Sequence, residues 1–175
     1  RPEVREGQAL AEEPRQDAPQ EQAPPQAEEG LSTANIRKAG AADLPAVLSL
    51  LRELDPPGAP EPDAAESARR FARIATYPDY AVYLAEEGSV PVGTFAILVM
   101  DNLAHGGAPE GIVENVVVAE GRRGQGIGRA MMRFAMDRCA EAGCYKLVLS
   151  SNVRREAAHR FYADLGFVQH GLSFS

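Results

Sequence analysis

The chain has 175 residues, a length that predicts one domain large enough to bury a hydrophobic core. Its residues are 45% apolar and 25% charged, as in ordinary globular proteins, and no apolar run approaches the length of a membrane-spanning helix, about 18 residues. The formal net charge of −7 comes mostly from residues 1–30, which hold three Arg and eight Asp or Glu. The remainder carries no basic excess for nucleic acid, so we expect neither a nucleic-acid partner nor a membrane span.

The first 30 residues differ in composition from the rest of the chain. They are rich in Glu, Gln, Pro and Ala, with no aromatic residue and no β-branched residue after Val4. Such a segment cannot bury enough apolar surface to order itself. We expect residues 1–30 to form a disordered or partner-dependent tail and residues 31–175 to form a single domain. The lack of a basic region followed by an apolar stretch predicts no secretory signal and a cytoplasmic location.

The first half of the predicted domain contains a strand, two helices and a hairpin. In chain order these are a strand near Ile36, helices over 43–54 and 64–75, and strands over 80–86 and 90–100. Both helices show apolar residues at helical spacing, and Pro45 lies in the first turn of the earlier one. The two strands flank a short turn containing glycine, which is typical of a hairpin.

From Ile112 the pattern alternates between strands and helices. The expected elements are strands over 112–118, 145–150 and 167–172 and helices over 126–142 and 155–165. Because a strand, a helix and a second strand in succession form a crossover, the strands over 112–118 and 145–150 should be parallel neighbours. We therefore predict an α/β or α+β fold with a mixed central sheet flanked by helices.

A glycine-rich turn links the strand over 112–118 to the next helix. Residues 123–128 read Arg-Gly-Gln-Gly-Ile-Gly. The first turn of a helix leaves backbone N–H groups without partners, and the helix dipole favours an anion there. Glycines allow a bulky phosphate to approach these N–H groups, and Arg123 adds positive charge. The turn is a candidate pyrophosphate site, with tight turn packing as the competing interpretation of its glycines.

Two other phosphate-binding motifs do not fit this turn. A Walker loop requires Lys followed by Ser or Thr after its glycines, and the chain has no such pair there. The dinucleotide fingerprint requires a glycine where Arg129 or Met131 stands. The sequence therefore argues against both of these nucleotide-binding classes.

Two segments resemble the GCN5-related N-acetyltransferase (GNAT) superfamily. Residues 123–128 match its Gln/Arg-x-x-Gly-x-Gly/Ala signature, and Phe-Tyr-Ala-Asp-Leu-Gly-Phe over 161–167 is similar to its C-terminal segment. The resemblance extends over 36–172, and residues 114–118 resemble the small-molecule enzymes of the superfamily. It implies that acetyl-coenzyme A enters where the two parallel strands splay apart.

The resemblance also implies which residues hold the cofactor. Main-chain groups of Val116, Val117 and Val118 would bond to the pantetheine arm. The residues expected at the pyrophosphate are Arg123, Gly124, Gln125, Gly126, Ile127, Gly128 and Arg129.

Tyr162 and Glu114 are the candidate catalytic residues. Tyr162 resembles the tyrosine that relatives place beside the thioester sulfur, and a phenol with an ordinary pKa of about 10 can protonate a departing thiolate. Alternation places Glu114 on the same face as Ile112, Val116 and Val118, as a base acting through water or with a raised pKa. In the alternative interpretation Tyr162 is ordinary core, and Glu114 is a structural or substrate-orienting carboxylate.

No metal ion is expected. Four residues separate Cys139 from Cys144 without a second ligand pair, so both are predicted to be reduced core residues. His105, His159 and His170 suggest no metal constellation either, although His105 lies on a loop that could contact the acceptor.

Three functions are compatible with these features. The favoured one is an N-acetyltransferase that moves an acetyl group from acetyl-coenzyme A to a primary amine of a small molecule, directly and without an acyl-enzyme. The second acetylates a protein N-terminus or a Lys side chain, and the third is a non-catalytic acyl-coenzyme A sensor. Because relatives are often homodimers, the resemblance also implies a homodimer, with the segment after Leu172 as a candidate interface.

Overall fold

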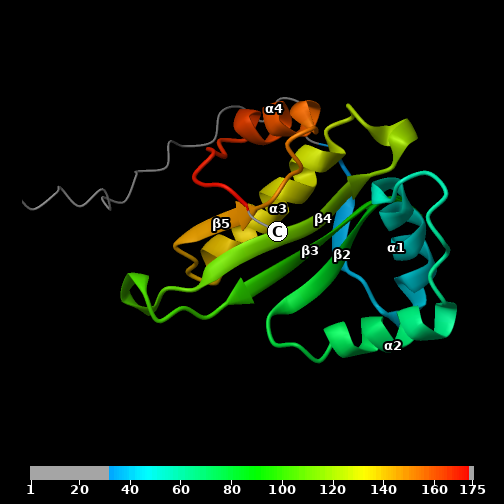
Figure 1. The fold of residues 1–175 in the computed structure, drawn as a ribbon, viewed down its shortest axis with the longest axis horizontal. Helices are drawn as coiled ribbons and strands as arrows, with labels where there is room; N and C mark the ends of the chain where they lie inside the picture. The colour runs from blue at the N-terminus through cyan, green and yellow to red at the C-terminus, as the bar shows by residue number, and fades with distance from the viewer. Residues whose placement is uncertain (1–31, 174–175) are drawn as a thin grey trace, which may run out of the picture.

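In the computed structural model, which describes residues 32–173, five strands form one mixed sheet with helices on both faces (Figure 1). The strands are β1 (Asn35–Lys38), β2 (Tyr80–Glu87), β3 (Val90–Met100), β4 (Glu110–Val118) and β5 (Lys146–Leu149). They lie in this order across the sheet, β4 and β5 being parallel and the other neighbours antiparallel. The predicted fold class and the predicted parallel pair are confirmed.

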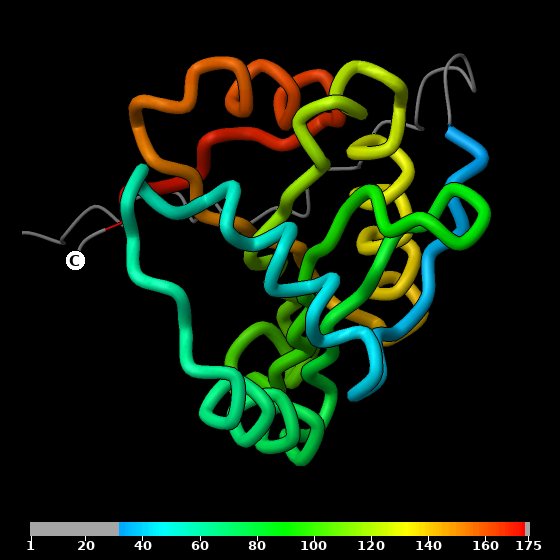
Figure 2. The backbone as a smooth tube through the Cα atoms, turned by 90° about the vertical axis from the view of Figure 1, so that its right-hand side faces the viewer, coloured from blue at the N-terminus to red at the C-terminus, as the bar shows by residue number. Residues whose placement is uncertain are grey.

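The helices divide between the two faces of the sheet. They are α1 (Leu44–Leu51), α2 (Ala64–Ile74), α3 (Ile127–Glu141) and α4 (Glu156–Asp164). Figure 2 shows α1 (cyan) crossing in front of the sheet and α2 (teal) below it, while α3 and α4 lie behind and above. Short 3-10 turns occur at Ala41–Asp43, Arg52–Leu54, His105–Gly107 and Glu120–Arg122. The predicted helix over 43–54 therefore consists of α1 between two such turns.

The larger core lies between the sheet and the helices α3 and α4. Val92, Phe95, Ile97 and Val113 from the strands pack against Ile127, Met131, Met132, Ala135 and Cys139 of α3 and Tyr162 of α4. A smaller core on the other face joins Leu84 and Val117 to Val47 and Leu50 of α1. Burial of apolar surface on both faces holds the sheet between two helical layers.

The two cysteines are free thiols, as predicted. Cys139 is buried in the larger core, whereas Cys144 is half-buried beyond the end of α3. Burial, followed by the proximity of Cys144, raises the pKa of Cys139 to about 12. Because the thiolate is the reactive form, Cys139 is chemically inert at neutral pH.

The predicted strand over 167–172 is wrong. This segment follows α4 as irregular chain, and Val168 and Leu172 are each 74% exposed. The Phe167 N–H donates to the carbonyl of Tyr162, which folds the chain back onto the helix. Within the described residues this segment pairs with no strand, although the outer edge of β5 is unpaired.

Two further predictions concern the ends of the chain and the compartment. The predicted tail over 1–30 lies outside the described residues, so it and the predicted single domain over 31–175 stay predictions. None of the helices between residues 32 and 173 is long and apolar enough to cross a membrane. The cytoplasmic location also stays a prediction.

Arg37 anchors the edge strand β1 to its surroundings. Its guanidinium donates to both carboxylate oxygens of Asp43, at 2.7 and 2.8 Å, and to both of Glu86, at 2.7 and 2.9 Å. The Gly40 N–H also donates to Asp43, at 2.7 Å. The bonds from Arg37, and then that from Gly40, lower the pKa of Asp43 to about 2.

We expect Asp43→Asn to destabilise the fold at pH 7 and to have a smaller effect as the pH falls. The folded-state pKa is depressed, so the carboxylate contributes stability above its ordinary pKa of 3.8, and this contribution is lost as the pH falls toward about 2. Urea unfolding at pH 7, 4 and 2.5 measures the effect, with the exposed Asp164→Asn as control. An equal loss of stability at all three pH values would contradict this account.

Candidate active site

β4 contains one extra residue near its middle. Thr94 of β3 pairs with Val117 and Ala96 pairs with Glu114, so two steps along β3 match three steps along β4. Asn115, inside this interval, has a φ of 56°, in the left-handed region. These are the features of a β-bulge, which bends a strand and interrupts its regular pairing.

The bulge lies where β4 and β5 separate. Val113 and Leu149 form the last pair of the parallel ladder. Beyond this pair β4 continues to Val118, whereas β5 ends. The two parallel strands therefore splay apart, as the sequence resemblance implied.

The main chain of β4 beyond the bulge presents polar groups to this opening. The Ala119 N–H points toward β3, where it donates to the carbonyl of Val92. Because main-chain groups alternate in direction along a strand, those of Val118 and Val116 point away from β3. The carbonyl of Val118 accordingly accepts a hydrogen bond from the side chain of Arg123, at 3.1 Å. Of the three residues expected to bond to pantetheine, Val116 and Val118 are therefore suitably oriented.

The bulge also corrects the predicted alternation around Glu114. Glu114 shares a face with Ile112, as predicted, because their partners on β3 are two residues apart. The residue that shares this face beyond the bulge is Val117, which packs in the smaller core. Val116 and Val118 pack instead against the larger core on the opposite face. The prediction that they share the face of Glu114 is wrong, because the extra residue reverses the alternation.

The glycine-rich turn between β4 and α3 exposes the start of the helix. Gly124 and Gly126 have φ of 77° and 78°, the left-handed region that favours glycine. The first helical bond runs from the Ala130 N–H to the carbonyl of Gly126. The N–H groups of Ile127, Gly128 and Arg129 therefore have no acceptor within the helix. A Cβ added at Gly124 would meet no atom within 4 Å, so open space adjoins the turn.

Gly128 also has a packing role. A Cβ at this position would lie 3.2 Å from the ring of Phe161 on α4 and 3.6 Å from the side chain of Val118. Gly128 therefore permits α3 to approach α4 and β4 closely. The competing interpretation of tight packing therefore applies to Gly128, and its predicted contact with the pyrophosphate stays a prediction.

Arg123 is held by other parts of the chain. Its guanidinium forms an ion pair with Glu53, at 2.6 Å, in addition to its bond to Val118. The second carboxylate oxygen of Glu53 accepts from the Glu120 N–H, at 3.2 Å. Gln125 donates to the carbonyl of Gly121, at 3.3 Å, within the turn itself. No local sequence pattern predicts the role of Glu53, because it lies 70 residues before Arg123 in the chain.

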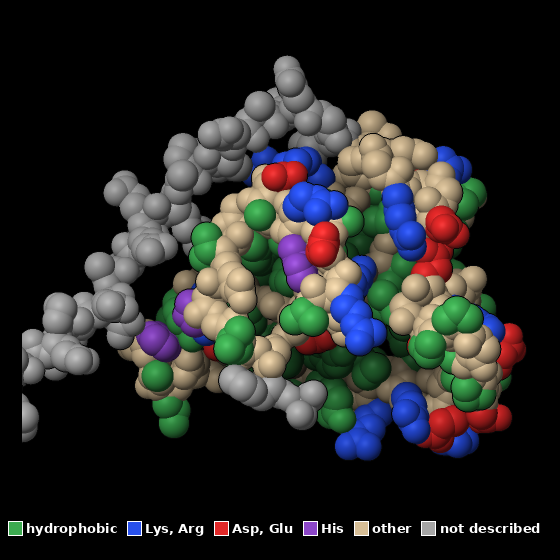
Figure 3. Space-filling view, turned by 45° about the horizontal axis from the view of Figure 1, so that its top comes forward, with side chains coloured by type: hydrophobic (Ala, Val, Ile, Leu, Met, Phe, Trp, Pro, Cys, Tyr) green, Lys and Arg blue, Asp and Glu red, His purple; other side chains and the backbone are tan. Residues whose placement is uncertain are grey.

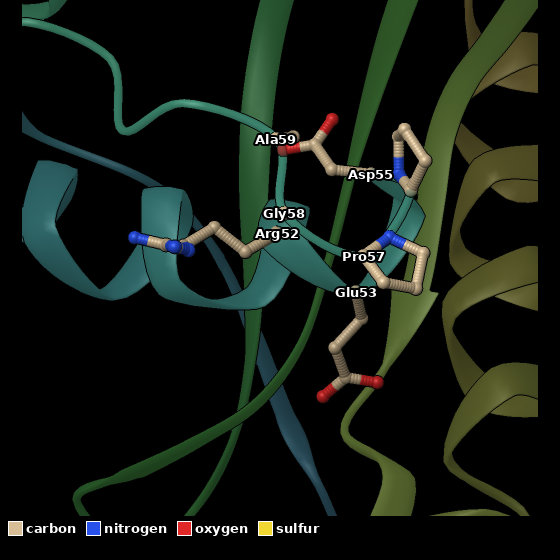
Figure 4. A pocket seen from close by; sticks show the side chains of 7 residues that line it. Arg52, Glu53, Asp55, Pro57, Gly58 and Ala59 are labelled. Atoms are coloured by element: carbon tan, nitrogen blue, oxygen red, sulfur yellow. The ribbon is translucent and has the colours of Figure 1, made fainter.

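A shallow cavity of about 270 Å³ adjoins Glu53 and is lined by residues 52, 53 and 55–59. In Figure 4 the side chains of Arg52, Glu53 and Asp55 point in different directions. Since a specific small-molecule site needs polar groups that converge, this cavity by itself is not a ligand site.

Tyr162 lies in the larger core with 9% of its surface exposed. Its ring contacts Phe161 and Phe167, with centroids 5.2 and 5.9 Å away. Burial raises the pKa of Tyr162, against a smaller opposite effect from Arg155. The phenol is therefore protonated at neutral pH, a requirement for the predicted proton donor.

Glu114 is exposed, and it lies on the opposite face of the sheet from Tyr162. The two candidate catalytic residues therefore do not share a pocket on one face of the sheet. A molecule placed in the opening between β4 and β5 would have access to groups from both faces. Figure 3 brings the α4 side forward and shows Lys and Arg side chains (blue), interspersed with Asp and Glu (red), around a hollow.

The histidines have local partners. His105 stacks on Tyr145, with ring centroids 4.2 Å apart, and its φ of 51° lies in the left-handed region. His159 is 2.9 Å from the carbonyl of Asn152. Within residues 32–173, no three His, Cys, Asp or Glu side chains form a group that could hold a metal ion.

The known proteins that this chain resembles include acetyltransferases. The model of the Acetyltransferase (GNAT) family matches residues 45–167. A relative in Oryza sativa subsp. japonica, "Probable glucosamine 6-phosphate N-acetyltransferase 2", is 33% identical over 133 residues, which are 73% of this chain and 77% of that protein. The aminoalkylphosphonate N-acetyltransferase of Salmonella typhimurium is 30% identical over 105 residues, 60% of this chain and 68% of that protein.

The fold is also that of a solved N-acetyltransferase. The crystal structure of glucosamine-6-phosphate N-acetyltransferase from Arabidopsis thaliana superposes with a TM-score of 0.70 and 28% identity, covering 82% of this chain and 97% of that one. The chain therefore belongs to the Acetyltransferase (GNAT) family, as its motifs implied. Its enzyme class is N-acetyltransferase.

The packing role of Gly128 can be tested by enlarging its side chain. We expect Gly128→Val to destabilise the fold by about 1–3 kcal/mol, because its methyl groups would overlap the ring of Phe161. Gly128→Ala should cost less, since a single Cβ requires a shift of only a few tenths of an ångström. Guanidinium unfolding measures both variants. A Gly128→Val chain as stable as the wild type would show that the helices are not in close contact there.

Proposed function

We propose that this enzyme transfers the acetyl group of acetyl-coenzyme A directly to the primary amine of a small molecule. The opening between β4 and β5, next to the unpartnered N–H groups at the start of α3, is the observation that carries the proposal. Two relatives named for acetylating small phosphorus-containing amines support a small-molecule acceptor over a protein one.

The geometry of the turn suits the coenzyme. N–H groups from Gly124 to Arg129 would bind the pyrophosphate, and the outward main-chain groups of Val116 and Val118 would bind the pantetheine arm. Hydrogen bonds to a charged group contribute about 1.5–3 kcal/mol each, so several together offset the cost of association. When bound, the coenzyme supplies an acetyl group activated as a thioester. Arg123 keeps its pair with Glu53 and so shapes the turn in addition to any direct contact with phosphate.

Two side chains would manage the protons of the reaction. At neutral pH an alkylammonium must lose a proton at a cost of about 4–5 kcal/mol before its nitrogen can attack the carbonyl carbon. Glu114, on an exposed face, would accept that proton through water. As the carbon–sulfur bond breaks, Tyr162 would donate its phenolic proton to the departing sulfur. The nitrogen of the tetrahedral adduct would lose its second proton to water, Tyr162 would be reprotonated from solvent, and Glu114 would return its proton to solvent. One proton is then released overall, which balances the reaction.

We expect Tyr162→Phe to bind acetyl-coenzyme A as the wild type does but to turn over about 10²–10⁴-fold more slowly, because only the proton donor is lost. Release of free thiol with an amine measures turnover, and calorimetry measures binding. Tyr145→Phe, which removes a phenol elsewhere, is the matched control. An unchanged rate in Tyr162→Phe would exclude the assigned acid. Folded wild-type protein with no affinity for acetyl-coenzyme A or coenzyme A would exclude the proposed function itself.

The proposed enzyme is also a homodimer. Within the described residues β5 pairs only with β4, so its outer edge lacks a strand partner. The irregular segment after α4 carries the exposed apolar side chains Val168 and Leu172, and its Ser173 hydroxyl lies 3.0 Å from that of Ser150, just after β5. An unpaired edge flanked by exposed apolar residues favours association with a second copy.

Light scattering should therefore give twice the chain mass of 18.8 kDa. We expect Leu172→Asp to shift this mass toward the monomer, because a charge would enter the apolar contact. Val90→Asp, at the exposed first residue of β3, is the control and should leave the mass unchanged. A monomeric wild type would refute the dimer.

A further inference from the structure

The face of the sheet that carries Glu114 is covered at one end by α1, and Phe71 of α2 packs against the same cluster. Leu84 and Val117 pack under α1 in the smaller core. Further along the same face come two rows across β2, β3 and β4, which are Val82–Ala96–Glu114 and Tyr80–Leu98–Ile112. In the second row all three side chains are only half-buried, so this part of the face is accessible.

Aromatic side chains and one arginine line the β2 side of this accessible area. Tyr80 stacks on Tyr77, with ring centroids 6.3 Å apart and planes inclined by 17°. The guanidinium carbon of Arg73, near the end of α2, lies 5.9 Å from the centroid of the Tyr77 ring. A continuous series of contacts therefore connects Arg73 through Tyr77 to the row of Tyr80. In Figure 1 the chain passes from the end of α2 directly into β2 beside this face.

Arg73 differs from the other arginines of α2 in its surroundings. Arg69 and Arg70 both form ion pairs with Glu66 on the same helix. Within residues 32–173, Arg73 has no carboxylate at ion-pair distance and contacts the aromatic ring instead. A guanidinium on an aromatic face is oriented, and it keeps its five N–H donors for an anion.

The other end of the accessible area is negatively charged. Burial, and then the charge of Glu114, raise the pKa of Tyr80, so the carboxylate and the phenol are electrostatic neighbours. The face thus presents a carboxylate at the opening between β4 and β5, two aromatic rings with an apolar floor, and a guanidinium. This arrangement is complementary to a molecule with an ammonium group at one end and an anion at the other.

We propose that Arg73 determines the specificity of this enzyme for amines that carry a phosphate or phosphonate group. The amine would lie at Glu114, and the carbon skeleton would lie against Tyr77 and Tyr80. A guanidinium binds two oxygens of a phosphorus oxyanion at once, an interaction that an uncharged acceptor cannot make. The inference rests on the proposed transfer of an acetyl group to a small amine and adds the class of acceptor.

Matched acceptor pairs test the proposal. Glucosamine 6-phosphate is compared with glucosamine, and 2-aminoethylphosphonate with ethylamine, so that each pair differs only in the anion. We expect Arg73→Ala to raise the KM for the anionic member of at least one pair by about tenfold or more. The kcat, the KM for acetyl-coenzyme A and the KM for the uncharged member should not change. Arg73→Lys should retain part of the preference, since it keeps the charge without the planar fork.

Arg69→Ala is the control, because it removes an arginine of the same helix whose partner is Glu66, and it should leave every KM unchanged. Calorimetry of the acceptors with wild-type and Arg73→Ala protein provides a readout that does not require turnover. Equal binding of both members of both pairs by the wild type would overturn the inference. A preference that persists in Arg73→Ala would overturn it as well.

These outcomes are separate from failure of the proposed function. Acetylation without any preference for the anionic acceptor would leave the acetyltransferase activity in place and remove the role of Arg73. Lack of affinity for acetyl-coenzyme A would instead exclude the activity, while acceptor calorimetry would still decide what Arg73 recognises.

Discussion

The single extra residue in β4 is the constraint on which the site depends. With Asn115 in a left-handed conformation, the strand bends, its ladder with β5 ends at Val113, and the side-chain alternation reverses. Glu114 then lies on the face of the sheet that α1 covers. The main-chain groups of Val116 and Val118 lie at the opening between β4 and β5. A regular strand would continue the parallel ladder and close this opening, because strands hydrogen-bond along their whole common length when nothing interrupts them.

The turn that follows the bulge combines conformational freedom with close packing. Left-handed glycines at 124 and 126 direct the chain into α3 and leave its first N–H groups without partners, whereas Gly128 allows α3 to contact Phe161. An ion pair between Arg123 and Glu53 joins this turn to the segment after α1. Both helical layers therefore support the turn, and this support fixes the N–H groups in place before a ligand arrives, which lowers the entropy cost of binding.

The proposed chemistry uses the difference between the two faces of the sheet. Tyr162 is buried among aromatic rings, and burial keeps its phenol protonated. Glu114 is exposed and can exchange protons with water. An acceptor that approaches from the face of α1 would meet charged and aromatic groups there, while in the proposed arrangement the thioester carrier would bind at the strand edge and helix start. The opening between β4 and β5 is where the two substrates would meet.

Much of this organisation follows from sequence patterns that are local. Hydrophobic periodicity predicted the helices and most strands, the crossover predicted the parallel pair, and the glycines beside Arg123 predicted the turn, because each depends on neighbouring residues. Tertiary structure alone decided the bulge at Asn115, the pairing of Arg123 with Glu53 and the irregular course of 167–172. Each of these depends on parts distant in the chain: the register against β3, a carboxylate from another element, and the failure of the last segment to pair with the free edge of β5. Such contacts form only when the whole chain has folded, so local sequence patterns do not predict them.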